Sequence, residues 1–413
     1  MSAVAPPRVE DLTSTPGAQL SVSGVEVAHR VPTLAETFSS RRNSIAFLRW
    51  FFAVSVVVDH TYAIARFDHG QGLISRWTAG QDSLGGLAVA GFFVLSGFLV
   101  SRSRDRMASG LRYLWHRVLR IFPGFWVCLL VTAVVLAPIE WHFESGKGIS
   151  ALFSYRNGPW QYLRANYLLT IHQWTIGPLL SHTPRAQVGA SAGAAWDGSL
   201  WSLIYEFRCY IVVAVVGLIA SRLVRRRTFV VLTILMAGLV AVYEVMPKHT
   251  VLHTFSFIEP FIAPAGFVRL AFCFALGALL YFYADSIPIR GELLALSAAV
   301  FLVTLHYGGL YLIGFVAFAY CILGAAVRLP IYRWDRFGDL SYGIYIYAFP
   351  AQMLLAAHNF QRFGLLAFLL ASITISSLAA FASWHLVEKN ALRLKSLAWP
   401  RRLRLPPVGE LAS

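Results

Sequence analysis

Ionisable side chains lie inside stretches of this sequence that are otherwise apolar. The first such stretch contains Arg49, Asp59 and His60, and the fourth contains Glu206. A charged group is costly in apolar surroundings, so each of these residues is a functional candidate. An imidazole with a carboxylate to orient it is the usual general-base pair. We therefore predict that His60 and Glu206 are the catalytic residues.

Three arginines form a second candidate group. Arg49 and His60 are eleven residues apart, close to three helical turns, so on one helix they share a face about 16 Å apart along the axis. Arg117 and Arg120 also share a face, near the start of the third apolar stretch. Guanidinium groups stay charged and bind phosphates bidentately, so Arg49, Arg117 and Arg120 are candidate phosphate ligands. For Arg117 and Arg120, anchoring to anionic lipid is the alternative.

Structural roles remain open for the other buried charges. His60 could be a histidine that is hydrogen-bonded across helices, and Glu206 could pair with Arg269 or another buried arginine. Asp59 cannot face the same way as its neighbour on a helix, so we expect it to be the structural partner of an arginine. The roles of Arg208 and Arg269 are left undecided.

The elements that position these residues follow from composition. The chain has 413 residues, of which 57% are hydrophobic and only 13% charged, and its mean hydropathy is +0.61. Such a chain has the bilayer as its main solvent, and a membrane helix needs about 20 mainly apolar residues. We predict an all-α polytopic membrane protein of about ten transmembrane helices, with a tight glycine turn between the seventh and eighth. The predicted spans are 45–67, 83–101, 121–139, 200–220, 228–246, 263–284, 291–306, 308–327, 338–358 and 364–387.

The basic residues set the predicted orientation. With the N-terminus in the cytoplasm, 24 of the 35 lysines and arginines lie in cytoplasmic segments, eight lie outside and three lie within spans. This is the bias that the positive-inside rule requires of a protein of the inner (plasma) membrane with both termini cytoplasmic. The net charge of +15 therefore reflects topology and contact with anionic lipid, and we expect no nucleic-acid partner.

The remaining segments are short tails and one large loop. Residues 1–42 are rich in Pro, Ser and Thr and are predicted to be a disordered cytoplasmic tail, and 396–413 a basic cytoplasmic tail. The extracytoplasmic loop 140–199 mixes tryptophans with short polar groups, which suits a sugar or a lipid headgroup; aromatic belts at the membrane interface are the alternative.

The four cysteines lie in apolar stretches with no short spacing between any two: Cys128, Cys209, Cys273 and Cys321. We interpret them as small core residues, and we predict no metal site and no permanently bound cofactor.

Five sequence strings, in this order, resemble the acyltransferase-3 family of membrane-bound O-acyltransferases over residues 43–395. They are Leu48-Arg49-Trp50 with His60; Gly91-Phe92-Phe93-Val94-Leu95-Ser96-Gly97; Arg117-Val118-Leu119-Arg120; Trp201-Ser202-Leu203-Ile204-Tyr205-Glu206; and Gly338-Asp339-Leu340-Ser341-Tyr342-Gly343. Taken alone, the Gly91–Gly97 pattern is explained by close helix packing.

The resemblance implies an acyl-CoA donor, with acetyl-CoA as the family-weighted choice, entering from the cytoplasm. It implies O-acylation of an envelope glycan, a glycolipid or a glycosylated natural product, and an essential role for His60. We assign acyl-CoA binding to Arg49, Arg117, Arg120, Ser96 and Gly97, and acceptor binding to Trp201 and Tyr205.

The chain departs from the family pattern at three places. Tyr347-Ala348 replaces a frequent Trp-His before Phe349-Pro350, so a second histidine is absent there, and Val387-Glu388-Lys389-Asn390 lacks a Pro that often follows Glu-Lys. No appended extracytoplasmic domain is seen, so we expect the membrane unit and the loop 140–199 to select the acceptor. The alternative function is a polytopic transporter or flippase of a glycan or lipid without acyl transfer, although we see no internal repeat of the kind common in transporters.

Overall fold

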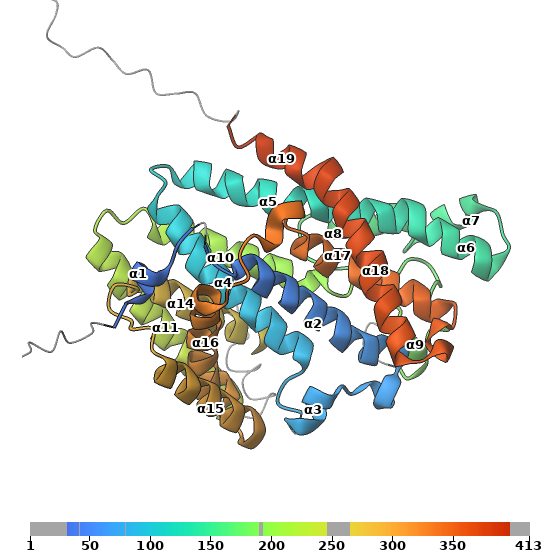
Figure 1. The fold of residues 1–413 in the computed structure, drawn as a ribbon. Helices are drawn as coiled ribbons and strands as arrows, with labels where there is room; N and C mark the ends of the chain where they lie inside the picture. The colour runs from blue at the N-terminus through green and yellow to red at the C-terminus, as the bar shows by residue number, and fades with distance from the viewer. Residues whose placement is uncertain (1–30, 41, 79, 190–192, 246–264, 397–413) are drawn as a thin grey trace, which may run out of the picture. The chain divides into compact units, whose positions relative to one another are not determined.

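The computed structural model describes residues 31–40, 42–78, 80–189, 193–245 and 265–396. Within these ranges the regular structure is helical, and the only β feature is an isolated bridge between Thr33 and Pro288 (Figure 1). The longer apolar helices are α2 (Ile45–Ala65), α4 (Leu84–Asp105), α5 (Gly110–Val131), α10 (Leu203–Val216), α11 (Arg222–Val245), α14 (Ala265–Phe282), α15 (Gly291–Tyr307), α16 (Phe315–Arg328), α17 (Ser341–Ala357) and α18 (Leu365–Ser383).

Each predicted span overlaps one of these helices, which confirms the all-helical class. In the described part of the chain, six helical segments are long and apolar enough to cross a membrane. They are Ile45–Ala65, Leu84–Asp105, Gly110–Ser145, Arg222–Val245, Leu310–Arg328 and Leu365–Arg393. The chain is therefore a multi-pass membrane protein, while the count of ten spans and the cytoplasmic location of both termini stay predictions.

The third helix is longer than its predicted span 121–139. It begins at Gly110 and continues through a π-helical turn, η2 (Thr132–Leu136), into α6 (Ala137–Ser145). A search for apolar residues misses its first turns because they carry arginines. The π turn directly precedes Pro138, which lacks the N–H that a regular α-helix would use.

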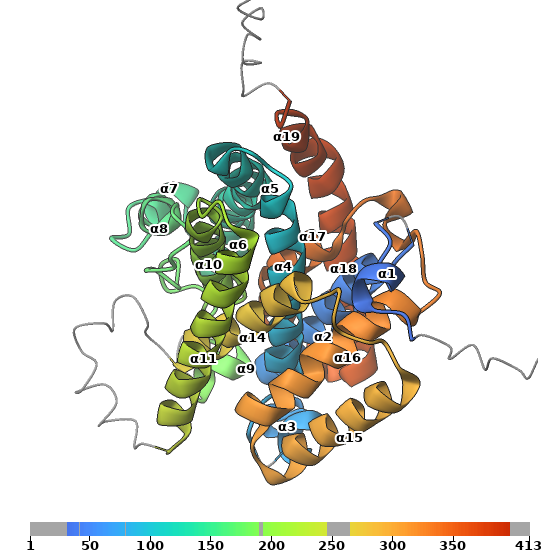
Figure 2. The same ribbon diagram turned by 90° about the vertical axis from the view of Figure 1, so that its left-hand side faces the viewer.

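Helix α4 packs against α2 on one side and α14 on the other (Figure 2). The contact with α14 is reciprocal. A Cβ atom at Gly97 would lie 2.0 Å from the Phe274 carbonyl oxygen, and one at Gly277 would lie 2.0 Å from the Val94 carbonyl oxygen. Both positions therefore require glycine, and the two backbones approach closely because neither carries a side chain.

Helix α17 packs against α2 and α18, and it contains Pro350. A proline in a helix removes the N–H that would bond the carbonyl four residues earlier. That carbonyl belongs to Ile346, and the Cys128 thiol of α5 shares its one hydrogen between this oxygen at 3.5 Å and Asp197 Oδ1 at 3.7 Å. A side chain of a neighbouring helix thus fills the place of the missing backbone donor.

The turn between α15 and η4 and the N-terminal segment were both addressed by sequence predictions. Gly308 and Gly309 join α15 to η4 (Leu310–Gly314) with φ values of 118° and 85°, so the predicted tight glycine turn is confirmed. Within the predicted N-terminal tail, the described residues fold: α1 (Leu34–Thr37) starts with a capping box of Thr33 and Glu36. The predicted basic tail 396–413 lies outside the described residues except for Ser396.

The segment between α6 and α10 contains three short helices: α7 (Ile149–Phe153), α8 (Pro159–Asn166) and α9 (Pro184–Gln187). Its aromatic residues divide by exposure, because Trp196 is fully buried whereas Trp160 is 57% exposed. The buried Asp197 accepts hydrogen bonds from the Tyr162 hydroxyl at 2.6 Å and the Thr132 hydroxyl at 3.2 Å. Burial raises the pKa of Asp197 to about 7 against these hydrogen bonds.

Candidate active site

A cavity of about 100 Å³ lies among α2, α4, α5, α10 and α17. Its wall combines three arginines with one carboxylate, several hydroxyl groups and apolar side chains. The polar lining residues are Arg49, Ser96, Arg117, Arg120, Ser202, Glu206, Tyr210, Ser341, Tyr342 and Tyr345. Five residues predicted as site residues from the sequence therefore share one cavity: Arg49, Ser96, Arg117, Arg120 and Glu206.

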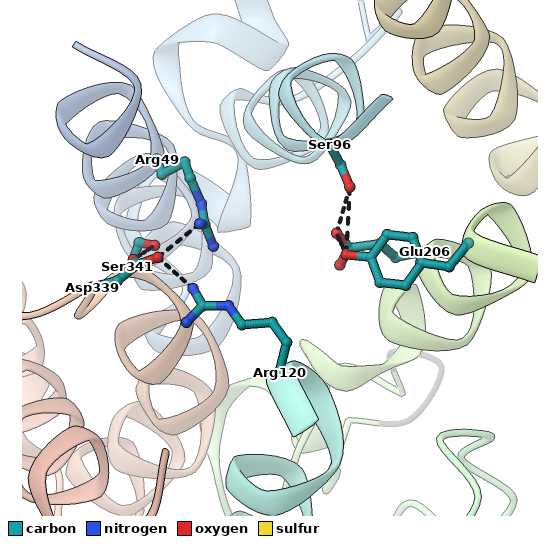
Figure 3. A network of polar contacts seen from close by, with 7 residues as sticks. Arg49, Ser96, Arg120, Glu206, Asp339 and Ser341 are labelled. Atoms are coloured by element: carbon teal, nitrogen blue, oxygen red, sulfur yellow. Dashed lines mark hydrogen bonds and ion pairs between the residues drawn. The ribbon is translucent and has the colours of Figure 1, made fainter. Parts of the chain in front are cut away.

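Asp339 joins two of these arginines (Figure 3). Its Oδ2 atom accepts a hydrogen bond from Arg49 at 2.7 Å and another from Arg120, while Oδ1 accepts one from the Ser341 hydroxyl at 2.6 Å. Burial by itself would raise the pKa of Asp339. The charges of Arg120 and Arg49 and the Ser341 hydrogen bond outweigh burial and hold that pKa well below its usual range. Asp339 is therefore ionised, and it fixes both guanidinium groups.

Arg117 is held differently from the other two arginines. It donates to the Ser103 hydroxyl at 3.2 Å, and its guanidinium lies 5.7 Å from the Tyr113 ring centre and 5.8 Å from that of Tyr210. Its buried Nε atom has no hydrogen-bond partner. Among the described residues no carboxylate forms an ion pair with it. Arg117 thus brings a positive charge to the cavity that an anionic ligand can use.

Glu206 lies on the α10 side of the cavity (Figure 3). One of its oxygens, Oε1, accepts hydrogen bonds from the Ser96 hydroxyl at 2.9 Å and the Tyr210 hydroxyl at 2.5 Å. The alternative partner considered for it, Arg269, pairs with Glu244 at 2.6 Å. Glu206 is therefore a hydrogen-bond acceptor held by α4 and by its own helix.

His60 is not among the residues that line the cavity. Its ring contacts that of Phe349 edge to face, with 5.0 Å between ring centres, and its Nδ1 atom is buried without a hydrogen-bond partner. Phe349 follows Tyr345, a cavity residue, by one turn of α17, or about 6 Å along the helix axis. Arg185 of α9 is a charged neighbour of the imidazole. Glu206 thus lines the cavity whereas His60 does not, and among the described residues no hydrogen bond joins the two.

The other predicted residues lie apart from the cavity wall. Gly97 faces α14 in the close contact described above, which is the packing role that the sequence left open. Trp201 is 37% exposed and meets Tyr205 edge to face at 5.8 Å. Asp59 accepts a hydrogen bond from the Ser83 hydroxyl at 2.9 Å, where α4 begins. The binding roles predicted for Gly97, Trp201 and Tyr205 stay predictions.

Sequence reasoning missed three polar residues of this region. Asp339 was predicted only as part of the Gly338–Gly343 sequence match. Its place just before a helix could have drawn attention to it, because an acidic side chain is favourable near a helix N-terminus. Tyr210 follows Glu206 by one helical turn, a spacing that places both on one face. Glu388, buried in η7 (Trp384–Glu388), accepts from the Ser383 hydroxyl at 3.0 Å. The sequence includes Glu388 in the Glu-Lys string of the family pattern but gives it no role.

Comparison with known proteins finds a family model and named relatives. A family model described as an acyltransferase domain matches residues 42–384. An O-acetyl transferase of Shigella phage Sf6 is 29% identical over 355 residues, which are 83% of this chain and 94% of that protein. Nodulation protein 10 of Rhizobium leguminosarum bv. viciae is 26% identical over 386 residues, which are 89% of this chain and 98% of that protein. No solved structure matches the chain.

Proposed function

Because the chain belongs to the acyltransferase-3 family, we propose that this acyltransferase moves an acetyl group from acetyl-CoA to a hydroxyl group of an envelope glycan, a glycolipid or a glycosylated natural product. The name of the phage relative, an O-acetyl transferase, supports both the acetyl group and the oxygen acceptor. The alternative considered from the sequence, a carrier without acyl transfer, finds no support in this family membership.

The donor end of the proposal rests on the arginine cavity. Arg49, Arg117 and Arg120 meet there, and arginine is the side chain best suited to hold phosphate in a partly buried site. Arg117 supplies the charge that no described carboxylate neutralises, while Asp339 holds the other two in place. In this proposal the three bind the phosphates of coenzyme A at the cytoplasmic side of the inner membrane.

In this proposal the acyl-bearing arm of the donor extends from the cavity to His60. The pantetheine arm passes Ser96, Glu206 and Tyr210 and then the Tyr345–Phe349 turn of α17. The thioester carbonyl reaches His60 at the outer side of that turn. Trp201, Tyr205 and the loop 140–199 are proposed to hold the acceptor there.

The chemistry assigned to His60 is general-base catalysis. The neutral imidazole takes the proton of the acceptor hydroxyl as its oxygen attacks the thioester carbonyl, and the C–S bond breaks as the ester forms. The imidazolium then returns the proton to the leaving thiolate, which departs as coenzyme A. A two-step variant, in which the imidazole first accepts the acetyl group, uses the same residues. Glu206, whose Oε1 accepts from Ser96 and Tyr210, is assigned here to the donor arm; its predicted catalytic role of orienting the imidazole stays a prediction.

The observation that carries the proposal is a buried, unpartnered imidazole nitrogen one helical turn beyond an arginine-lined cavity. Purified protein in nanodiscs, supplied with acetyl-CoA labelled in its acetyl group, tests it. We expect His60→Gln to slow label transfer to acceptor, or release of coenzyme A, by about 100-fold or more. The exposed His306→Gln of α15, outside the cavity wall and the loop 140–199, serves as the matched control. Transfer by His60→Gln at the wild-type rate would overturn the assignment.

A further inference from the structure

Four side chains with metal-binding atoms meet away from the arginine cavity. Glu140 and Glu144 belong to α6, His182 precedes α9, and His358 follows α17. One ligand atom from each of Glu140, Glu144 and His182 lies within 4.8 Å of the others. The Nε2 atom of His358 is 3.0 Å from Glu140 Oε2. The prediction of no metal site rested on the cysteines alone, so this group was not expected from the sequence.

The two carboxylates lie so close that they need either a shared proton or a cation between them. Glu140 and Glu144 are four residues apart on one helix, so they share a face, and only 1% of the Glu140 side chain is exposed. A buried carboxylate is costly unless it is paired or coordinates a metal. His358, on the outer side of Glu140, provides a hydrogen bond there. On its other side, Glu140 lies next to Glu144 and His182.

The hydrogen bonds of His182 indicate what lies between these groups. Its Nε2 atom is 3.1 Å from the Ala357 carbonyl oxygen, and a carbonyl only accepts, so Nε2 carries a hydrogen. In the neutral ring Nδ1 then presents a lone pair, and it faces Glu144 Oε1 at 3.4 Å. That oxygen already accepts from the Leu180 N–H at 3.0 Å. With a neutral ring, two acceptors face each other, and either a proton on Nδ1 or a metal cation resolves this arrangement.

We propose that Glu140, Glu144 and His182 bind a divalent transition-metal cation of the Zn²⁺ type. Two carboxylates and one imidazole form a common ligand set for Zn²⁺, with water completing the shell. A metal-bound histidine typically donates its other ring N–H to a backbone carbonyl, as His182 does to Ala357, and ligating carboxylates are in turn hydrogen-bonded, as Glu140 is by His358. The site therefore contains both the side chains that would bind the cation and the groups that orient those side chains.

The cation would join three segments that are distant in sequence: the end of the long α5–α6 helix, the segment before α9 and the end of α17. Helix α9 contacts α2 and carries Arg185, the charged neighbour of His60. The metal therefore acts as a positioning element on the side of the molecule that holds His60. This inference does not depend on acyl transfer, because metal binding is measured directly.

The competing arrangement has no metal: His182 and His358 are both protonated and form ion pairs with the two glutamates. The test uses full-length protein purified without a histidine tag, passed over a chelating resin and reloaded with ZnSO₄. Metal content is read by mass spectrometry after desalting, affinity by competition with a chromophoric chelator, and stability by thermal unfolding. The variants are His182→Gln and Glu144→Gln, both at the surface end of the site. His142→Gln, on the outer face of α6, is the matched control.

We expect one Zn²⁺ per chain in the wild type and in His142→Gln, with a melting temperature that rises on loading. In His182→Gln and Glu144→Gln we expect the affinity to fall at least about 10-fold, since losing even a partner of a ligand weakens metal binding about 10- to 100-fold. Wild-type protein that retains no metal, or His182→Gln that retains it with unchanged affinity, would overturn the proposal. Loss of acetyl transfer alone would not bear on it.

Discussion

Asp339 accepts hydrogen bonds from both Arg49 and Arg120 through a single carboxylate oxygen. The two arginines come from α2 and α5, and the carboxylate precedes α17, so one acid fixes three segments around the cavity. The pairing also limits where each guanidinium can point. Its remaining N–H groups are held in place before a ligand arrives, which reduces the entropy lost on binding.

The first prediction concerns this carboxylate. We expect Asp339→Asn to destabilise the protein at pH 7 by about 3 kcal/mol, because removing one partner of a buried pair leaves uncompensated charge. The Michaelis constant for acetyl-CoA should rise as well, because two arginines lose their common anchor. Thermal unfolding in detergent and steady-state kinetics measure the two effects. Asp335→Asn, at an exposed acid of the preceding turn, is the control.

The same substitution has a pH signature. The pKa of Asp339 is lowered by folding, so its contribution to stability is complete above its unfolded pKa of about 4 and is lost as the pH falls below that value. The difference in melting temperature between wild type and Asp339→Asn should therefore be largest at neutral pH and shrink below about pH 4. A difference that stays constant over this range would contradict the ion-pair explanation.

A second prediction separates phosphate binding from packing at Arg117. Replacing it by glutamine should weaken acetyl-CoA binding about 10- to 100-fold, the range for a hydrogen bond to a charged group. S-acetylpantetheine carries no phosphate, so its use as donor should be unaffected by the same change. Arg112→Gln, at an exposed position of the same helix, is the control. Equal losses with both donors would show that Arg117 acts through the fold.

A third prediction tests the role of Gly97. The methyl group of Gly97→Ala would meet the backbone of α14, and overpacking of this kind costs about 1–3 kcal/mol. We expect a lower melting temperature with an unchanged Michaelis constant for acetyl-CoA. Gly238→Ala, where a Cβ meets nothing within 4 Å, should keep or raise stability. If Gly97→Ala instead weakens only donor binding, the predicted contact with the coenzyme A arm is supported.

A fourth prediction follows from Asp197, whose pKa burial raises to about 7. The folded state holds this proton more tightly than the unfolded state, so stability from this group is greatest below about pH 4 and declines as the pH rises toward 7. Asp197→Asn has no such proton, so its melting temperature should fall less than that of the wild type between pH 5 and 8. Asp68→Asn, at an exposed acid, should follow the wild-type curve.

The sequence predicts the elements of the site better than its contacts. Apolar stretches locate the helices, and helical spacing puts Arg117 and Arg120 on one face, which lines the cavity. A tight turn at Gly308–Gly309 is expected because the predicted spans 291–306 and 308–327 leave only Tyr307 between them. These features are local, and local spacing determines them.

The spacing of residues along the sequence does not determine which helices lie side by side. The sequence pairs Glu206 with His60 by residue type, but residue type says nothing about which helices touch, and Glu206 accepts from Ser96 and Tyr210. Asp339 pairs with arginines from two distant helices, and no periodicity relates the three. The early start of α5 was missed because its first turns are amphipathic and basic, unlike a span in lipid.

Pro350 gives α17 a weak point between its two functional ends. At one end Asp339, supported by Ser341, holds the arginines, while His358 beyond the other end contacts Glu140. At the proline a single thiol from Cys128 replaces a backbone hydrogen bond, and a thiol is the weaker donor. Bending of the helix therefore concentrates at Ile346–Pro350, beside Phe349 and His60. A force on either end of α17 would therefore tilt the Phe349 ring against the His60 imidazole.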